Sequence, residues 1–328
     1  LGVTADCAQA LAKETGVTLV LLGRSPAPVA EAAWLAAAHD DAALKKALLE
    51  RAPAGQRPSP KQLGELTRGI LAARDIRASL EALRTLGHRA EYRQLDVRDA
   101  NAVASVIADA RALGPLRGIV HGAGVLRDKR IEDKRDDDFD QVLDPKLSGL
   151  SALLDATRAD DLTLIALFAS VSGRFGRRGQ SDYAVANQAL VSMAQAEALA
   201  RPHARVVALD WGPWAGGMVT SALEATFRAE GVSLIPLAAG AKAFVDEALA
   251  SANSGVEVVL GAGFGAELEA NWSLARVEQL DPHWPVLADH RLAGRSVVPL
   301  ALVIEWFAAV AKSGASDLVL QGIEDVRV

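Results

Sequence analysis

The side chains best suited to chemistry lie in one stretch, FASVSGRFGRRGQSDYAVAN, at residues 168–187. This stretch is typical of a buried strand end at Ser170, a glycine-rich loop and the first turns of a helix. Tyr183 and Asn187 are four positions apart and would share one helix face. Strand ends of open α/β sheets bind ligands, and a hydroxyl and a phenol aimed at one point can both hydrogen-bond a carbonyl oxygen. Because the phenol can also give a proton, the stretch indicates carbonyl reduction. Taken alone, it is explained more simply by a half-buried helical tyrosine and a strand-terminal serine.

The composition argues against several other functions. The 328 residues carry a net charge of −6, which indicates no nucleic-acid-binding surface. Cys7 is the single cysteine, so no internal disulfide or cysteine-rich metal site can form, and a reducing cytoplasm is predicted. The six histidines show no metal-ligand spacing, so no metal is expected. No signal peptide is recognised, and the longest apolar run, residues 297–310, is too short for a bilayer and contains Glu305, so no membrane contact is expected.

The first residues have the pattern of a helix that follows a glycine. Gly2 precedes helical spacing that ends near Gly16, as in a strand–glycine-loop–helix unit that binds a pyrophosphate. We therefore expect a first strand, and most of its glycine loop, upstream of Leu1. Residues 17–23 are a second strand that ends before Arg24. An arginine at this point favours NADP over NAD, because it suits a 2′-phosphate; the alternative is a solvated arginine.

Strand and helix patterns alternate through the rest of the first 265 residues. Residues of about 26–78 are Ala- and Leu-rich with helical spacing at 29–51 and from 61 onward, which predicts a helical insertion after the second strand. Further strands are predicted at residues 90–97, 116–120, 162–169, 204–209 and 256–260. Six strands alternating with helices predict an α/β fold with a doubly wound parallel sheet.

The composition changes after residue 265. A polar segment with two prolines leads to His290, Gly294 and Pro299, followed by an apolar helix predicted at 300–311. We therefore divide the chain at this point, with residues 1–265 as one domain and residues 266–328 as a linker and part of a second.

The ordered motifs resemble the ketoreductase domains of type I polyketide and fatty acid synthases, a branch of the short-chain dehydrogenase/reductase family. The resemblance runs from Gly2 to about residue 263, apart from the insertion. It rests on Gly-Arg after strand two, Leu-Asp-Val after strand three, His-Gly-Ala-Gly, a Pro-Lys-x-x-Gly helix, the Ser–Tyr–Asn set and Trp-Gly-Pro-Trp. HGAGVLRDKRIEDK and SGRFGRRGQSDYAVAN are most similar to ketoreductases of polyunsaturated fatty acid synthases. The resemblance implies a Rossmann-like fold.

The resemblance also implies roles for single residues. Tyr183 would be the proton donor and Ser170 would orient the substrate carbonyl, with Lys146 and Asn187 completing a tetrad. Asp128, the last acid of the family's Leu-Asp-Asp signal, would control stereochemistry and suggests a 3R product. The residues implied to bind NADPH are Gly2, Arg24 at the 2′-phosphate, Asp96 and Val97 at the adenine, Gly122, Ala123 and Gly124 at the centre, and Pro213 and Trp214 at the nicotinamide.

The tail resembles the start of a hot-dog dehydratase domain, which would be a partial α+β segment. His290, Gly294 and Pro299 match a His-x3-Gly-x4-Pro motif in which the histidine is catalytic. A structural histidine is an equally good explanation, because the acid that this family uses as its partner comes from a second half. Hot-dog domains usually pair, so the segment suggests a homodimer.

The function implied is NADPH-dependent reduction of a 3-oxoacyl thioester inside a multidomain synthase. The partners would be an acyl carrier protein with a phosphopantetheine-bound chain, which could meet Arg174, Arg177 and Arg178, and the other synthase domains. The alternative is a non-catalytic structural domain of such a synthase.

Overall fold

The computed structural model describes residues 2–53, 57–216, 219, 221–262, 284–292 and 295–314. The chain divides into two compact units, Leu1–Phe264 and Gly265–Val328. Each unit is described by itself.

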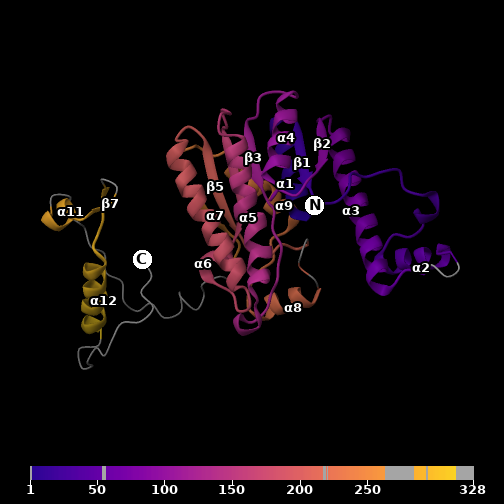
Figure 1. The fold of residues 1–328 in the computed structure, drawn as a ribbon. Helices are drawn as coiled ribbons and strands as arrows, with labels where there is room; N and C mark the ends of the chain where they lie inside the picture. Colours follow the sequence, from indigo (N-terminus) through magenta and orange to yellow (C-terminus); the bar gives the residue numbers. More distant parts are fainter. Residues whose placement is uncertain are drawn as a thin grey trace. The chain divides into compact units, whose positions relative to one another are not determined.

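Unit 1 alternates helices and strands along most of its length (Figure 1). The six strands described in it lie within a few residues of the predicted positions. Its elements in chain order are α1 (Gly2–Thr15), β1 (Leu19–Gly23), η1 (Ala33–Leu35), α2 (Asp41–Arg51), α3 (Pro60–Thr85), β2 (Ala90–Gln94), α4 (Ala100–Arg111), β3 (Gly118–His121), η2 (Ile131–Asp133), α5 (Asp136–Ala156), β4 (Leu164–Ser170), α6 (Val171–Phe175), α7 (Ser181–Ala200), β5 (Arg205–Trp211), α8 (Ser221–Ala229), α9 (Leu237–Ala248) and β6 (Glu257–Leu260).

The strands form two parallel sheets. β1 pairs with β2, and β3, β4, β5 and β6 form the second sheet in that order. The parallel α/β arrangement is as predicted, and the strands described in unit 1 form two sheets. β1 and β3 are not hydrogen-bonded to each other, because a cavity of about 1080 Å³ lies between their edges. The open edge explains why the apolar residues of β1 are only half-buried.

Helices cover both faces of the larger sheet and create two cores. On one face, α4, α5 and α7 pack on β3 and β4 through side chains such as Val103, Leu150 and Leu190. On the other face, α1 and α9 pack on β4 and β5 through side chains such as Leu11 and Phe244. Each fully buried side chain of this size contributes about 1.5–3 kcal/mol to folding. The doubly wound arrangement thus fixes the carboxyl ends of β4 and β5, where the candidate site lies.

The part of the predicted insertion that precedes α3 packs against the first half of that helix. Ser59 and Gln62 form a capping box at the start of that helix, and the helix runs without a break past residue 78, where the insertion was predicted to end. The predicted helix at 29–51 begins only at Asp41, because the Asp40 side chain caps it by accepting from the Ala43 amide. Arg74 on α3 binds Glu31 and so attaches the segment between β1 and η1 to this helix.

The described part of unit 2 is small. It consists of α11 (Pro285–Asp289), a two-residue antiparallel ladder of β7 (Arg291–Leu292) with β8 (Arg295–Ser296), and α12 (Leu300–Gly314). The apolar helix after Pro299 is therefore present. The hot-dog segment stays a prediction, since the rest of residues 263–328 lies outside the described ranges.

Candidate active site

The end of β4 places a serine beside a short helix. Ser170 is 8% exposed, and its hydroxyl accepts a hydrogen bond from the Ser172 amide at 3.2 Å, which caps α6. Gly173 allows α6 to lie against α7, since a Cβ there would come within 3.1 Å of the Asn187 Cβ. This close approach brings the serine to the first turns of α7.

Tyr183 and Asn187 lie together on the first turns of α7. The Asn187 side-chain amide is buried and donates to the Tyr183 carbonyl oxygen at 2.7 Å. Burial raises the pKa of the Tyr183 phenol above its ordinary value, and hydrogen bonds with the Asn187 and Ser170 side chains lower it by less. The phenol therefore lies close to both side chains.

Lys146 reaches the same place from α5. It is 3% exposed, its amine donates to the Phe168 carbonyl oxygen at 2.8 Å, and its Nζ atom is 5.6 Å from the centre of the Tyr183 ring. Burial lowers the pKa of Lys146 to about 7. At the phenol, burial is the largest influence on the pKa and raises it. Lys146 lies near the ring and binds a backbone carbonyl.

A chain of polar groups links this site to Asp128. The Ser172 hydroxyl donates to the side-chain oxygen of Gln180 at 2.8 Å, and the Gln180 amide donates to Asp128 at 2.9 Å. The Asp128 charge raises the pKa of Tyr183. Sequence reasoning missed Gln180, which nothing but its place just before α7 distinguishes.

A buried ion pair fixes the start of α7. The Lys134 amine lies 2.7 Å from an Asp182 carboxylate oxygen, and both side chains are 1% exposed. The other Asp182 oxygen accepts from the Tyr183 amide at 2.8 Å. The pair thus ties the loop before α5 to the residue that carries the phenol. It too was missed, because neither charge stands out in a chain rich in charged residues.

The cavity between β1 and β3 brings most of the predicted cofactor residues together. Arg24, Asp96, Val97, Gly122, Ala123 and Gly124 all line it. A Cβ on Gly124 would come within 3.2 Å of the Lys146 Cε, and one on Gly122 within 2.9 Å of the Thr4 hydroxyl. The glycine loop therefore lies between the first turn of α1 and the lysine of the site.

These features fit a dinucleotide. Backbone amides at the start of a helix favour a pyrophosphate, a loop without side chains allows close approach, and Arg24 supplies a cation at the edge of the cavity. Asp96 already binds Arg98 at 2.7 Å, and this hydrogen bond lowers the pKa of Asp96.

Four predicted site residues lie elsewhere. Gly2 opens α1 but does not line the cavity, and neither do Pro213 and Trp214. Trp214 is 5% exposed, packs against Trp211 with ring centres 4.7 Å apart and the rings tilted by 58°, and leaves no room for a side chain at Gly240. Its indole is thus a core group in this structure. His290 belongs to unit 2, where it is exposed and bonded to the Val297 carbonyl oxygen at 2.9 Å; its dehydratase role rests on the resemblance alone.

Two of the three arginines expected to meet a carrier protein are paired within the chain. Arg174 binds Glu257 at 3.0 Å, and Arg177 binds Glu230 at 3.1 Å and lies over the Phe227 ring. The expected patch therefore has less unopposed positive charge than its sequence suggests.

His121 lies beneath the site and gives a testable pH dependence. It is 2% exposed and bonded to the Lys146 carbonyl oxygen at 2.9 Å, and burial lowers its pKa to about 4 from the ordinary 6.5. Between pH 6.5 and 4 the unfolded chain takes up a proton that the folded chain does not, so the free energy of unfolding falls as the pH falls. The full pKa shift of His121 corresponds to a loss of about 3 kcal/mol in the free energy of unfolding.

We expect His121→Asn to flatten this dependence. Urea unfolding followed by tryptophan fluorescence, at pH 7 and near pH 4, should show a smaller loss of stability on acidification than in the wild type. Equal losses in the two proteins would contradict the assignment.

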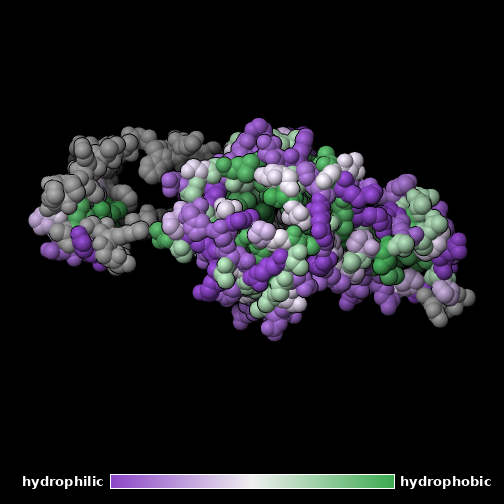
Figure 2. Space-filling view, turned by 90° about the horizontal axis from the view of Figure 1, so that it is seen from above, coloured by the Kyte–Doolittle hydropathy of each residue, from purple (hydrophilic) through white to green (hydrophobic). Residues whose placement is uncertain are grey.

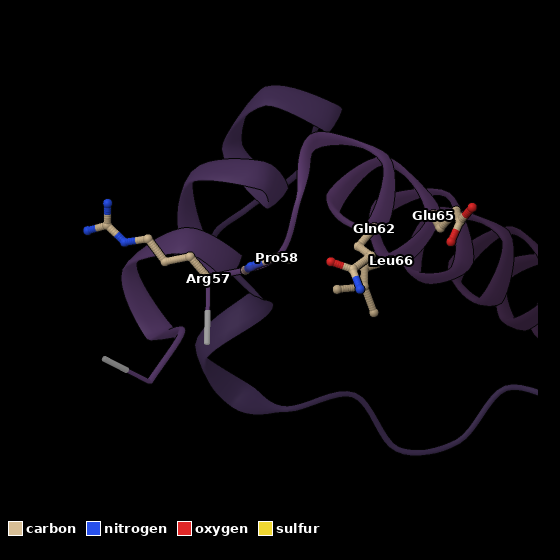
Figure 3. Close-up of a pocket in the computed structure, with 5 residues that line it drawn as sticks. All are labelled: Arg57, Pro58, Gln62, Glu65 and Leu66. Atoms are coloured by element: carbon tan, nitrogen blue, oxygen red, sulfur yellow. The ribbon is translucent and has the colours of Figure 1, made fainter. Parts of the chain in front are cut away.

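A second pocket of unit 1 contains none of the predicted site residues. A hollow of about 620 Å³ at the start of α3 is lined by Arg57, Pro58, Gln62, Glu65 and Leu66, and Figure 3 shows Arg57 extending away from that helix. Hydrophobic and hydrophilic residues are interspersed over the face of unit 1 in Figure 2.

Within the described ranges, no three His, Cys, Asp or Glu side chains gather to hold a metal ion. No helix in the part of the chain that the structure describes combines the length and apolarity needed to cross a bilayer.

Comparisons with known proteins agree with this geometry. Residues 2–216 match the family model described as "KR domain". A polyunsaturated fatty acid synthase subunit of Thraustochytrium sp. (strain ATCC 26185 / S-3) is 34% identical over 347 residues, which covers 100% of this chain and 12% of that protein. Polyketide synthase GfsE of Streptomyces halstedii is 41% identical over 138 residues, which covers 42% of this chain and 4% of that protein. The chain thus spans a small part of both relatives.

Solved structures show the same fold. A ketoreductase domain from the bacillaene assembly line has a TM-score of 0.60 at 26% identity, covering 81% of this chain and 54% of that chain. The N-terminal ketoreductase from the macrolactin assembly line has a TM-score of 0.61 at 24% identity, covering 83% of this chain and 45% of that chain, and supports the fold alone. The predicted Rossmann-like α/β fold is confirmed. The chain belongs to the KR domain family, found in polyketide and polyunsaturated fatty acid synthases.

Proposed function

We propose that this chain is the NADPH-dependent ketoreductase of a polyketide or polyunsaturated fatty acid synthase. It reduces a 3-oxoacyl thioester on acyl carrier protein to the 3-hydroxyacyl thioester, with 3R configuration. One observation carries the proposal: the Tyr183 phenol lies within reach of Ser170 and Asn187, with the Lys146 amine beside its ring and the glycine loop next to that amine.

The chain's residues suit a carbonyl that gains negative charge on oxygen. Ser170 and Tyr183 donate hydrogen bonds to this oxygen, and each such donor stabilises the transition state by about 3–4 kcal/mol. Tyr183 then gives its proton to the oxygen, and Lys146 stabilises the phenolate that remains. A reduced nicotinamide, when bound, supplies the hydride.

The cavity between β1 and β3 supports a further part of this proposal. Both strands leave backbone edges open toward it, and apolar side chains of both line it. A parallel strand with apolar side chains would pair with both edges. We propose that a further parallel strand lies here and that a glycine loop following it completes the cofactor site, so activity should be measured in the full natural polypeptide.

Arg24 is the residue that we propose to select NADPH. Its guanidinium suits a 2′-phosphate, so Arg24→Ala should raise KM for NADPH by about tenfold or more, in line with the loss of a charge-assisted hydrogen bond. KM for NADH should change little. Steady-state kinetics with both cofactors check this, with Arg93→Ala on β2 as a control. Equal changes for NADPH and NADH would contradict the assignment.

A direct assay tests the function as a whole. The full natural polypeptide is given NADPH and a 3-oxoacyl thioester of pantetheine or of acyl carrier protein, and the product is identified by mass and chiral chromatography. Formation of the 3R hydroxyacyl thioester is expected. A 3S product would overturn the role proposed for Asp128, and no turnover with a folded, cofactor-binding protein would favour the alternative of a non-catalytic structural domain.

A further inference from the structure

Asp210 is a buried acid that the proposed reaction leaves without a role. It lies next to the last residue of β5, is 1% exposed, and neither carboxylate oxygen has a hydrogen-bond partner among the described residues. An isolated carboxylate in such a place is strongly disfavoured unless it takes up a proton or faces a positive charge. Its neighbours must therefore explain it.

The register of the sheet places Asp210 beneath the candidate site. It pairs with Ala169, which directly precedes Ser170 on β4. Side chains alternate along a strand, and Ala169 and Ala208 belong to the core under α5 and α7. The Asp210 side chain therefore points to the face from which Lys146 and Asn187 enter the site.

Charged groups surround Asp210 on this face. From α5, Lys146 faces it, and the Asp210 charge raises the pKa of Lys146 against the effect of burial. From β6, Glu257 pairs with Ala208, two residues before Asp210, and adds a second acid near it; Arg174 of α6 binds Glu257 at 3.0 Å. From α7 and β3, the titratable groups near Lys146 are Tyr183 and the neutral His121.

Asp210 and Glu257 are two acids that cannot both be charged at low cost. Burial, followed by Glu257, raises the pKa of Asp210 well above its ordinary range, and Arg174 and Lys146 oppose this. A proton on Asp210 lets it donate to Glu257, whereas a charged Asp210 favours the ammonium form of Lys146.

We propose that Asp210 is a positioning residue that acts through Lys146: with Glu257 it forms a carboxyl pair that controls whether Lys146 carries a proton beside Tyr183. The proposal rests on the proposed reductase function. The transfer between Asp210 and Lys146 moves one proton and changes no oxidation state. The charged lysine is the form that stabilises the Tyr183 phenolate, so the carboxyl pair sets the alkaline limit of activity.

Two conservative variants should move that limit in opposite directions. Asp210→Asn removes the charge that holds the proton on Lys146. The alkaline limb of the pH profile of kcat/KM should therefore move to a pH about one unit lower, so that kcat/KM at a fixed alkaline pH falls about tenfold. Glu257→Gln removes the acid that keeps Asp210 protonated, so the limb should move up. Both profiles are recorded in the full natural polypeptide with saturating NADPH and a varied 3-oxoacyl thioester. Asp246→Asn, at an exposed acid of α9, is the control and should keep the wild-type profile.

The outcomes separate the inference from the reaction on which it rests. Wild-type turnover with opposite shifts in the two variants supports the carboxyl pair. If the wild type turns over and the alkaline limbs of both variants stay at the wild-type pH, the inference is overturned. A loss of rate in the variants that is equal at every pH also overturns it, because that is the result expected of a merely structural role. If Asp210→Asn does not fold, an upward shift in Glu257→Gln supports the inference and an unmoved limb overturns it. A wild type without turnover overturns the proposed function itself.

Discussion

Tyr183→Phe is expected to lower kcat for NADPH-dependent reduction of a 3-oxoacyl thioester by about 10²–10⁴-fold, the range typical of a lost general acid. The phenol is the one group of the site that can both bind the substrate oxygen and give it a proton. The ring would remain, because phenylalanine fills the same space beside Lys146. Cofactor binding should therefore be kept while turnover is lost.

The chain offers a matched control, since Tyr92 is its only other tyrosine. The Tyr92 hydroxyl donates to the Ser25 carbonyl oxygen at 2.7 Å, away from Tyr183. Tyr92→Phe should change kcat at saturating NADPH by less than about twofold, although KM for the cofactor can shift because Ser25 follows Arg24. Both variants are assayed in the full natural polypeptide, with cofactor titration as the test of folding. Turnover by Tyr183→Phe close to the wild-type level would remove Tyr183 from the reaction.

The fold was predictable because its signals are local. Parallel strands that are covered on both faces tend to be apolar runs, and each strand predicted between residues 17 and 260 is present in the structure. The spacing of Tyr183 and Asn187 is likewise a local helical property, and the structure places both beside Ser170. The break between β1 and β3 is not a local property, because strand pairing depends on which edges meet in space.

The parts of the site that the sequence did not predict depend on strand register and on packing. Asp210 differs from any other strand-end acid only because the sheet places it beside Ala169 and next to the strand that carries Glu257. Trp214 was expected at the nicotinamide, but the missing side chain at Gly240 lets its indole enter the core. The direction of the pKa shift at Tyr183 also depends on the whole fold, because burial is its largest cause.

The ion pair of Lys134 and Asp182 leads to the largest expected effect on stability. Removing one partner of a buried pair leaves an uncompensated charge and typically costs about 3–5 kcal/mol. Lys134→Met should do so here, because both side chains are 1% exposed. Since Asp182 also accepts from the Tyr183 amide, the loss should be concentrated at the start of α7.

Hydrogen exchange resolves this local effect, because it measures the free energy of opening for each segment. In Lys134→Met, amides of the first turns of α7 should exchange about 10²–10³-fold faster than in the wild type, whereas those of α9 should be unchanged. Lys242→Met is the matched control: its pair with Asp246 is 75% and 58% exposed, so we expect a change below about 0.5 kcal/mol. Unaltered protection of α7 in Lys134→Met would show that the buried pair does not hold Tyr183 in place, and the fixed position of the phenol would then have to come from the packing of Gly173 against Asn187 alone.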